Sequence, residues 1–146
     1  MEKIKLRNVE VYPFRSADDL IDYADEHKGI LVAVNAEKIL NANEVTLPII
    51  NGNIAYCDGS GAVLAAHQKG APQAVKIAGC ELWLKIVERF AGKRSFYIIG
   101  GKKAVNDATV ERLRHDYPGI DIVGHRDGYL RTADERRALI DDVAVS

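Results

Sequence analysis

The chain has 146 residues, which suits one domain of ordinary size and is long enough for a hydrophobic core. Its 20 Lys and Arg residues nearly balance 21 Asp and Glu residues, 47 % of the residues are hydrophobic and 28 % are charged. This composition excludes a collagen, a disordered chain, a disulfide scaffold and a polybasic nucleic-acid-binding protein. We therefore expect no nucleic acid among the partners.

The residues that could hold a metal or form disulfides are few and scattered. Cys57 and Cys80 form no C-x-x-C pair, no D-x-D signature occurs, and the histidines stand apart at 27, 67, 115 and 125. We predict two buried free thiols, no metal and no cofactor. The amino terminus has no apolar signal segment, and no apolar run approaches the roughly 20 residues that span a bilayer. The sequence therefore favours a soluble, cytoplasmic protein.

The chain alternates short apolar runs with amphipathic helical stretches. In chain order the pattern predicts a strand over Val9–Phe14, a helix from the N-cap Ser16 to Gly29, strands over Ile30–Asn35 and Ile54–Asp58, a helix over Val63–Gln68, a strand over Ala74–Ala78, a helix over Glu81–Ala91, a strand over Phe96–Gly100, a helix over Lys103–Tyr117, a strand over Ile120–Gly124 and a helix from Thr132. The alternation predicts an α/β fold with a mostly parallel sheet and helices on both faces.

Polar side chains and glycines follow several of these strands, at the edge of the sheet where such folds bind ligands. Asn35 can cap the next helix or donate its amide to a sugar or nucleotide. Asp58, followed by Gly59 and Gly61, can cap a helix or serve as a general base beside a close ligand. Both interpretations stay open for each residue.

Two later segments carry weaker signals. Gly100, Gly101 and Lys102 lie between a strand and a helix, which fits either an anion-binding turn or a plain tight turn. In the segment from Gly124 to Tyr129, His125 has no partner at ligand or triad spacing, so we interpret it as a surface or loop residue.

Taken together, these segments resemble a known family. The segments are Leu31–Lys38, Tyr56–Gly59, Val75–Trp83, Tyr97–Lys102, Tyr117–Gly124 and Asp127–Leu130, and their order and spacing are similar to those of the WecG/TagA/CpsF glycosyltransferases from about Val9 to about Ile140. The stretches VAVNAEK and AGCELW resemble those of the branch that transfers N-acetyl-D-mannosaminuronic acid from UDP in enterobacterial common antigen synthesis. The resemblance implies a Rossmann-like α/β fold.

The resemblance also implies a reaction and a set of residues. Family members are inverting, metal-independent enzymes that move an N-acetylmannosamine-type sugar from UDP to a polyprenyl-diphosphate-linked N-acetylglucosamine at the inner face of the plasma membrane. Asp58 stands where the family has its proposed catalytic base. The substrate-binding positions implied in the same way are Asn35, Glu37, Gly59, Lys76, Gly79, Gly100, Gly101, Lys102, Asp127, Gly128 and Tyr129.

Three positions depart from the family pattern. Lys76 replaces an Arg and loses its bidentate geometry, Glu81 replaces an Asp, and Ala33 replaces a Thr found in some members.

The family pattern also continues into a G-S-P-K-Q-E-like segment and a basic tail, so we expect residues 1–146 to form a single glycosyltransferase-like domain truncated at its C-terminus. A truncated, non-catalytic module that binds a nucleotide-sugar or assists assembly is the alternative. A homo-oligomer is compatible with either interpretation.

Overall fold

The structure is a computed structural model that describes all residues from Met1 to Ser146. Contacts within the chain divide it into two compact units, Met1–Ile86 and Val87–Ser146, and each is described by itself. The interpretation of residues 1–146 as one domain stays a prediction.

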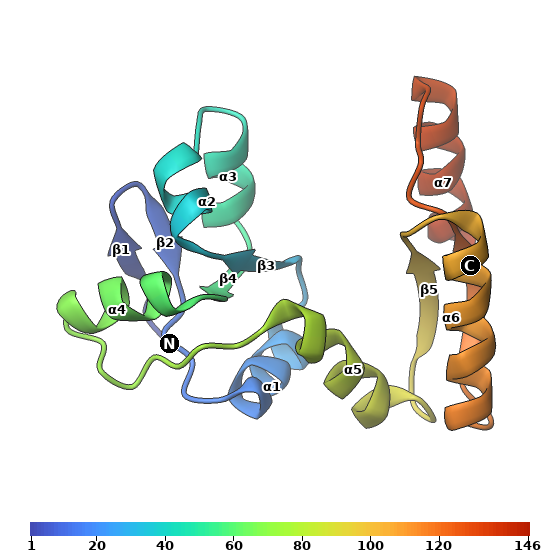
Figure 1. The fold of residues 1–146 in the computed structure, drawn as a ribbon, viewed down its shortest axis with the longest axis horizontal. Helices are drawn as coiled ribbons and strands as arrows, with labels where there is room; N and C mark the ends of the chain where they lie inside the picture. Colours follow the sequence, from blue (N-terminus) through green and yellow to red (C-terminus); the bar gives the residue numbers. More distant parts are fainter. The chain divides into compact units, whose positions relative to one another are not determined.

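Four short strands build the first unit (Figure 1). Strands β1 (Ile4–Leu6) and β2 (Val9–Val11) form an antiparallel hairpin, while β3 (Leu31–Val34) and β4 (Ile54–Cys57) pair in parallel. The strand predicted over Val9–Phe14 ends at Val11, because Pro13 has no N–H for a ladder. The amide of Tyr12 still donates to the carbonyl of Ala55 at 2.8 Å, which connects the hairpin with β4.

The strand predicted over Ala74–Ala78 is wrong, since this segment has no regular secondary structure. Its amides bond to two different elements: Val75 N donates to Phe14 O at 3.1 Å, and Ile77 N donates to Cys57 O at 2.9 Å. An extended segment that changes partner after two residues cannot build a continuous ladder. It nevertheless runs past the carboxyl end of β4 and so leads the chain to the site described below.

Five helices begin in the first unit: α1 (Ala17–His27), α2 (Ala36–Asn41), α3 (Thr46–Asn51), α4 (Ser60–Gln68) and α5 (Gly79–Phe90), which contains the boundary between the units. The predicted N-cap of α1 is confirmed, because the Ser16 hydroxyl accepts from Asp19 N at 3.0 Å. The helix ends earlier than predicted, at His27, and Lys28 takes the positive φ of +51° before Gly29.

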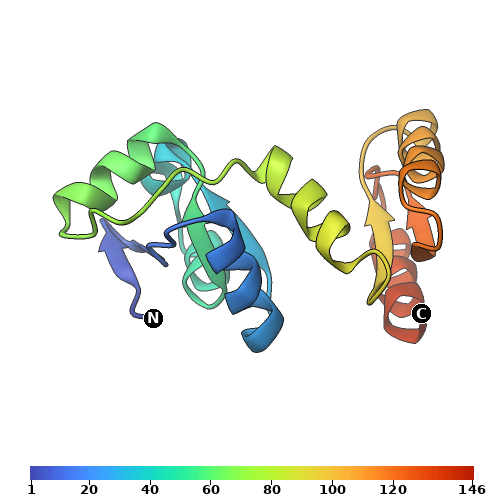
Figure 2. The same ribbon diagram turned by 90° about the horizontal axis from the view of Figure 1, so that it is seen from below.

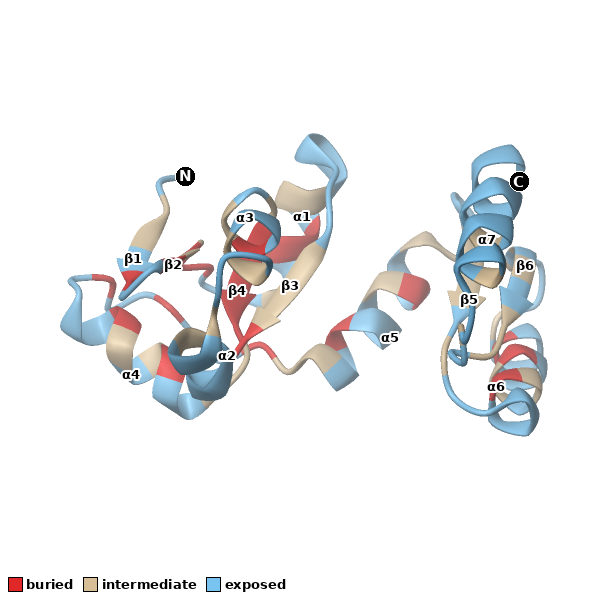
Figure 3. Ribbon diagram, turned by 90° about the horizontal axis from the view of Figure 1, so that it is seen from above, coloured by how far each residue is buried: buried red, intermediate tan, exposed pale blue.

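The core of the first unit lies around β4, whose four residues are all buried (Figure 3). Side chains from both strand pairs and from α3 and α4 meet there. The buried members are Leu6, Val9, Val11, Val34, Ile50, Ala55, Cys57, Ala62, Ala66 and Ala74. This packing fixes the end of β4, and with it the start of the loop that carries Asp58.

The second unit contains the parallel strands β5 (Ser95–Ile99) and β6 (Asp121–Arg126), connected by α6 (Lys103–Asp116). Tyr97 pairs with Gly124 across the two strands, and its ring occupies the space that a side chain on Gly124 would take. The last helix, α7 (Ala133–Val145), begins with the predicted cap at Thr132 and lies beside β5 (Figure 2), where the Tyr97 hydroxyl donates to Asp142.

The fold is α/β, with seven helices, two parallel strand pairs and one antiparallel hairpin. The prediction of a Rossmann-like α/β fold is confirmed, although each hydrogen-bonded ladder is only two strands wide. None of the helices combines the length and the apolar character that a membrane span requires.

Candidate functional site

The parallel register of β3 and β4 brings two predicted site residues together. Val34 pairs with Cys57, so Asn35 and Asp58 both follow directly at the carboxyl end of the pair. Asp58 N donates to Val34 O at 2.8 Å, which continues the ladder by one residue. The two polar side chains therefore start from neighbouring positions at the ligand-binding edge of the strands.

Gly79, the first residue of α5, lies against this edge. A Cβ atom added to it would be 3.0 Å from the Tyr56 hydroxyl, 3.4 Å from Asp58 Oδ2 and 3.6 Å from Ala33 Cβ. These distances leave no room for a side chain between α5 and the carboxylate. The structure thus gathers Asp58, Gly79 and Tyr56 in one small cluster.

The Asp58 carboxylate does not cap α4, although capping was one of its two predicted roles. The helix begins after Gly59, and no hydrogen bond from its first turn reaches Asp58. Both carboxylate oxygens are therefore available to accept a proton from a ligand. The general-base role is the interpretation of Asp58 that this geometry favours.

Tyr56 is buried beside Asp58, and its phenol stays protonated at neutral pH. Burial, followed by the charges of Asp58 and Cys80, raises the pKa of Tyr56 to about 12. Tyr56 and Asp58 are two residues apart around the end of the same strand, so both project from one face of it. A neutral hydroxyl next to the carboxylate can donate a hydrogen bond to Asp58 or to a bound sugar.

Asn35 caps α2, as one of its two predicted roles requires. Its Oδ1 accepts from Lys38 N at 2.9 Å, which leaves its Nδ2 group free to donate to a ligand. A Cβ atom on Gly59 would lie 3.5 Å from Asn35 Cβ, so the starts of α2 and α4 approach closely. Glycine at 59 permits this approach.

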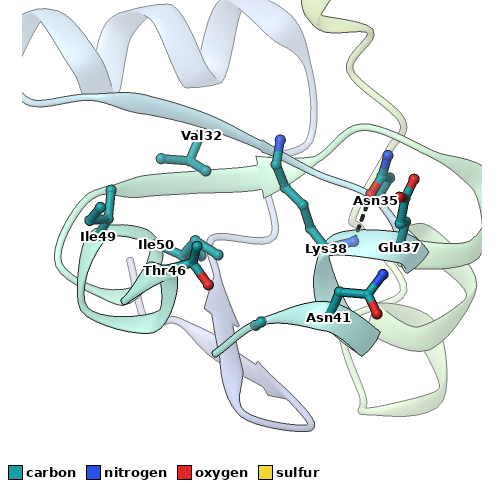
Figure 4. A pocket seen from close by; sticks show the side chains of 9 residues that line it. Val32, Asn35, Glu37, Lys38, Asn41, Thr46, Ile49 and Ile50 are labelled. Atoms are coloured by element: carbon teal, nitrogen blue, oxygen red, sulfur yellow. Dashed lines mark hydrogen bonds between the residues drawn. The ribbon is translucent and has the colours of Figure 1, made fainter. Parts of the chain in front are cut away.

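A pocket of about 530 Å³ opens beside this cluster, and Asn35 and Glu37 are among the residues that line it (Figure 4). Figure 4 shows these two residues at one end and Ile49 of α3 at the other. The Lys38 side chain also lines the pocket, and its Nζ donates a hydrogen bond to Ala33 O at 2.7 Å. A pocket with polar groups at one end and apolar groups at the other suits an amphipathic ligand.

Lys76 lies apart from this pocket. It is exposed and lines a separate cavity of about 130 Å³, together with residues from the starts of α1 and α5. The structure thus places Asn35, Glu37, Asp58, Gly59 and Gly79 around one edge of the first unit, and Lys76 on a neighbouring surface.

The predicted residues of the second unit form their own cluster at the carboxyl ends of β5 and β6. Gly100 and Gly101 have φ values of +134° and +69°, which strongly favour glycine. Gly100 N donates to Arg126 O at 3.1 Å and Gly128 N donates to Gly101 O at 3.0 Å. A Cβ on Gly128 would be 3.2 Å from Gly100 Cα, so the two glycine turns are in direct contact.

Asp127 shapes the second of these turns. Its Oδ1 accepts from Tyr129 N at 2.8 Å, and this hydrogen bond, with the nearby Arg126, lowers the pKa of Asp127. A carboxylate that is already hydrogen-bonded and has a lowered pKa is a poor proton acceptor. Asp127 is therefore a structural member of its loop.

A second pocket of about 510 Å³ adjoins this loop. Its lining includes four basic side chains and two acidic ones, together with Tyr129. The basic residues are Lys102, Lys103, Arg126 and Arg131, and the acidic residues are Asp127 and Glu135. Lys102 precedes α6, and its ammonium group cannot accept a hydrogen bond from the amides of the first turn. An excess of positive charge beside open helical amides favours an anionic ligand.

Sequence reasoning missed Tyr56 in the first site, Asn106 behind the glycine turn of the second, and one contact that Asn106 makes outside the sites. Tyr56 begins the segment Tyr56–Gly59, and its spacing of two residues from Asp58 could have indicated that both side chains lie on the same face of the strand. Asn106 continues the buried stripe of Val110 and Leu113 at helical spacing, whereas its apolar neighbour Val105, the residue that the pattern would place in that stripe, is 57 % exposed. His125 has a partner after all, because its Nδ1 lies 2.9 Å from Asn106 Oδ1.

One of the two cysteine predictions is also wrong. Cys57 is buried, but Cys80 is exposed in the first turn of α5. The next residue that packs inward is Leu82, so the apolar neighbours of Cys80 in the sequence belong to a different helix face.

No group of three or more His, Cys, Asp or Glu side chains is arranged to hold a metal ion. A family model with the description "Glycosyl transferase WecG/TagA/CpsF family" matches residues 4–146.

Proposed function

Because the chain belongs to the WecG/TagA/CpsF family of glycosyl transferases, we propose that it transfers N-acetylmannosaminuronate, or N-acetylmannosamine, from UDP to a polyprenyl-diphosphate-linked N-acetylglucosamine. The observation that carries this proposal is the position of Asp58. Its carboxylate follows β4, has no hydrogen bond to the protein, and lies against Gly79 and the Tyr56 hydroxyl. This is the arrangement that a general base for an acceptor hydroxyl requires.

In the proposed reaction Asp58 accepts the proton of the acceptor hydroxyl. The hydroxyl oxygen forms a bond to the anomeric carbon from the side opposite to UDP. The bond between the anomeric carbon and the UDP oxygen breaks, and UDP leaves with the electron pair. One displacement of this kind inverts the anomeric configuration, and the negative charge passes from the carboxylate to the departing UDP.

The two clusters have different proposed partners. The Asn35 amide and the neighbouring pocket of the first unit are polar at one end and apolar at the other, which supports contact with the sugars and the first part of the lipid. The glycine turns and the basic pocket of the second unit support contact with the anionic donor, UDP-sugar. The acceptor places the reaction at the cytoplasmic face of the plasma membrane.

An Asp58→Asn variant tests the base assignment. Transfer is measured as UDP release from UDP-N-acetylmannosaminuronate with a short-chain polyprenyl-diphosphate N-acetylglucosamine. Loss of a general base lowers the rate about 10²–10⁴-fold, while the affinity for UDP stays unchanged. Asp121→Asn, at an exposed position that begins β6, is the matched control and retains full transfer.

Full transfer by Asp58→Asn would refute the base assignment. An unaltered chain that binds UDP in calorimetry and never turns over would instead identify a non-catalytic nucleotide-sugar-binding module. The two measurements therefore separate the enzyme from its alternative.

A further inference from the structure

Asn106 is the only polar residue buried in the chain, and it is 2 % exposed. It belongs to α6, but its side chain bonds outside the helix. Nδ2 donates to Gly100 O at 3.1 Å and to Ile98 O at 3.3 Å, and Oδ1 faces His125 Nδ1 at 2.9 Å. Since both amide hydrogens point to carbonyl oxygens, Oδ1 accepts, and His125 donates from Nδ1.

These bonds fix the turn after β5 from its helix side. The other side is held by two backbone hydrogen bonds, from Gly100 N to Arg126 O and from Gly128 N to Gly101 O. Gly100 and Gly101 have no side chains to restrict them, and glycine moves between many conformations at little cost. The amide of Asn106 is the side-chain contact that selects one of these conformations.

Stability alone does not account for an amide at this position. The three hydrogen bonds of Asn106 and the burial of an apolar side chain of the same size stabilise a protein by similar amounts, so burial does not by itself call for an amide here. The other inward residues of this stripe, Val110 and Leu113, are apolar. An amide placed among them is better suited to holding the turn than to filling the core.

We propose that Asn106 is a positioning residue for donor binding, because it holds the Gly100–Gly101 turn in the shape that receives the anionic part of the nucleotide-sugar. This role rests on the proposed function, in which that turn contacts the donor. The side chain of His125 bonds to Oδ1 on the other side of Asn106 and makes no hydrogen bond to the turn. Removing the two amide donors should therefore weaken donor binding, and removing the histidine should not.

The test measures the affinity of the full chain for UDP by titration calorimetry. Asn106→Leu keeps the size and removes every hydrogen bond, whereas Asn106→Asp keeps the acceptor toward His125 and removes both donors. In each variant we expect the Kd for UDP to rise about tenfold or more. His125→Ala and Thr109→Val serve as controls with a change below twofold, since Thr109 bonds only to Val105 O within α6.

Circular dichroism and the melting temperature separate binding from folding in every variant. Folded Asn106 variants that bind UDP as the unaltered chain does would overturn the positioning role and leave the proposed donor site intact. If neither variant folds, Asn106 serves the core of its unit, and the positioning role is likewise overturned. If the unaltered chain does not bind UDP, the proposed donor site fails, and this role fails with it.

Discussion

Replacing Gly79 with alanine tests whether the geometry around Asp58 matters for catalysis. The new Cβ would lie 3.0 Å from the Tyr56 hydroxyl and 3.4 Å from Asp58 Oδ2. The contact with the hydroxyl is shorter than the ordinary distance of about 3.5–4.0 Å between nonbonded heavy atoms, and the contact with Oδ2 lies at the short end of that range. Tyr56 is buried and cannot swing away freely, so its hydroxyl has to shift by a few tenths of an ångström beside the carboxylate.

The expected effect on stability is small, and the expected effect on rate is larger. Overpacking costs about 1–3 kcal/mol, but alanine favours helix over glycine by up to about 1 kcal/mol at the start of α5. A misplacement of about 1 Å can lower a rate about 10²-fold. A shift of a few tenths of an ångström should therefore lower kcat/KM about tenfold, which corresponds to about 1.4 kcal/mol of transition-state stabilisation.

The assay compares UDP release by Gly79→Ala and by Gly92→Ala. Gly92 has open space around its Cβ direction, so its substitution should leave kcat/KM unchanged. The affinity for UDP should stay the same in both variants, because neither substitution changes a residue of the proposed donor turns at Gly100–Gly101 and Gly128. An unchanged kcat/KM in a folded Gly79→Ala variant would refute the argument that the Asp58 carboxylate acts from this position.

Two further predictions concern the strand pairs. A Cβ on Gly124 would overlap the Tyr97 ring at Cε2, so Gly124→Ala should destabilise the protein by about 1–3 kcal/mol in urea unfolding. This loss of stability should disappear when Tyr97 is also replaced with alanine. A loss that persists in the double variant would contradict the clash. Burial raises the pKa of the Cys57 thiol from 9.0 to about 11, so iodoacetamide at pH 8 should label Cys80 and spare Cys57 in the folded chain. The same shift means that the free energy of unfolding falls as pH rises from 9 to 11. A Cys57→Ala variant should show a smaller fall, and the fall that remains above pH 10 belongs to groups such as Tyr56, whose pKa is also raised.

The sequence by itself determined the order of the elements and the places where chemistry is concentrated. The N-caps Ser16 and Thr132 were predictable because capping depends on residues within one turn of each other. The continuous apolar runs predicted β3, β4 and β5, although only β4 is buried along its whole length. The strand-end positions of Asp58 and Gly100 followed from the same local pattern.

Only the tertiary structure decided which partner each of these residues meets. Gly79 and Asp58 are 21 positions apart in the chain, and their contact depends on a segment that turned out to bond to two different elements. Asn106 lies within a predicted helix and was not singled out from the sequence, but packing turns its side chain inward to Gly100 and His125. Local propensity cannot show such contacts, because long-range packing decides which helix face is buried and which carboxylate is left without a hydrogen bond.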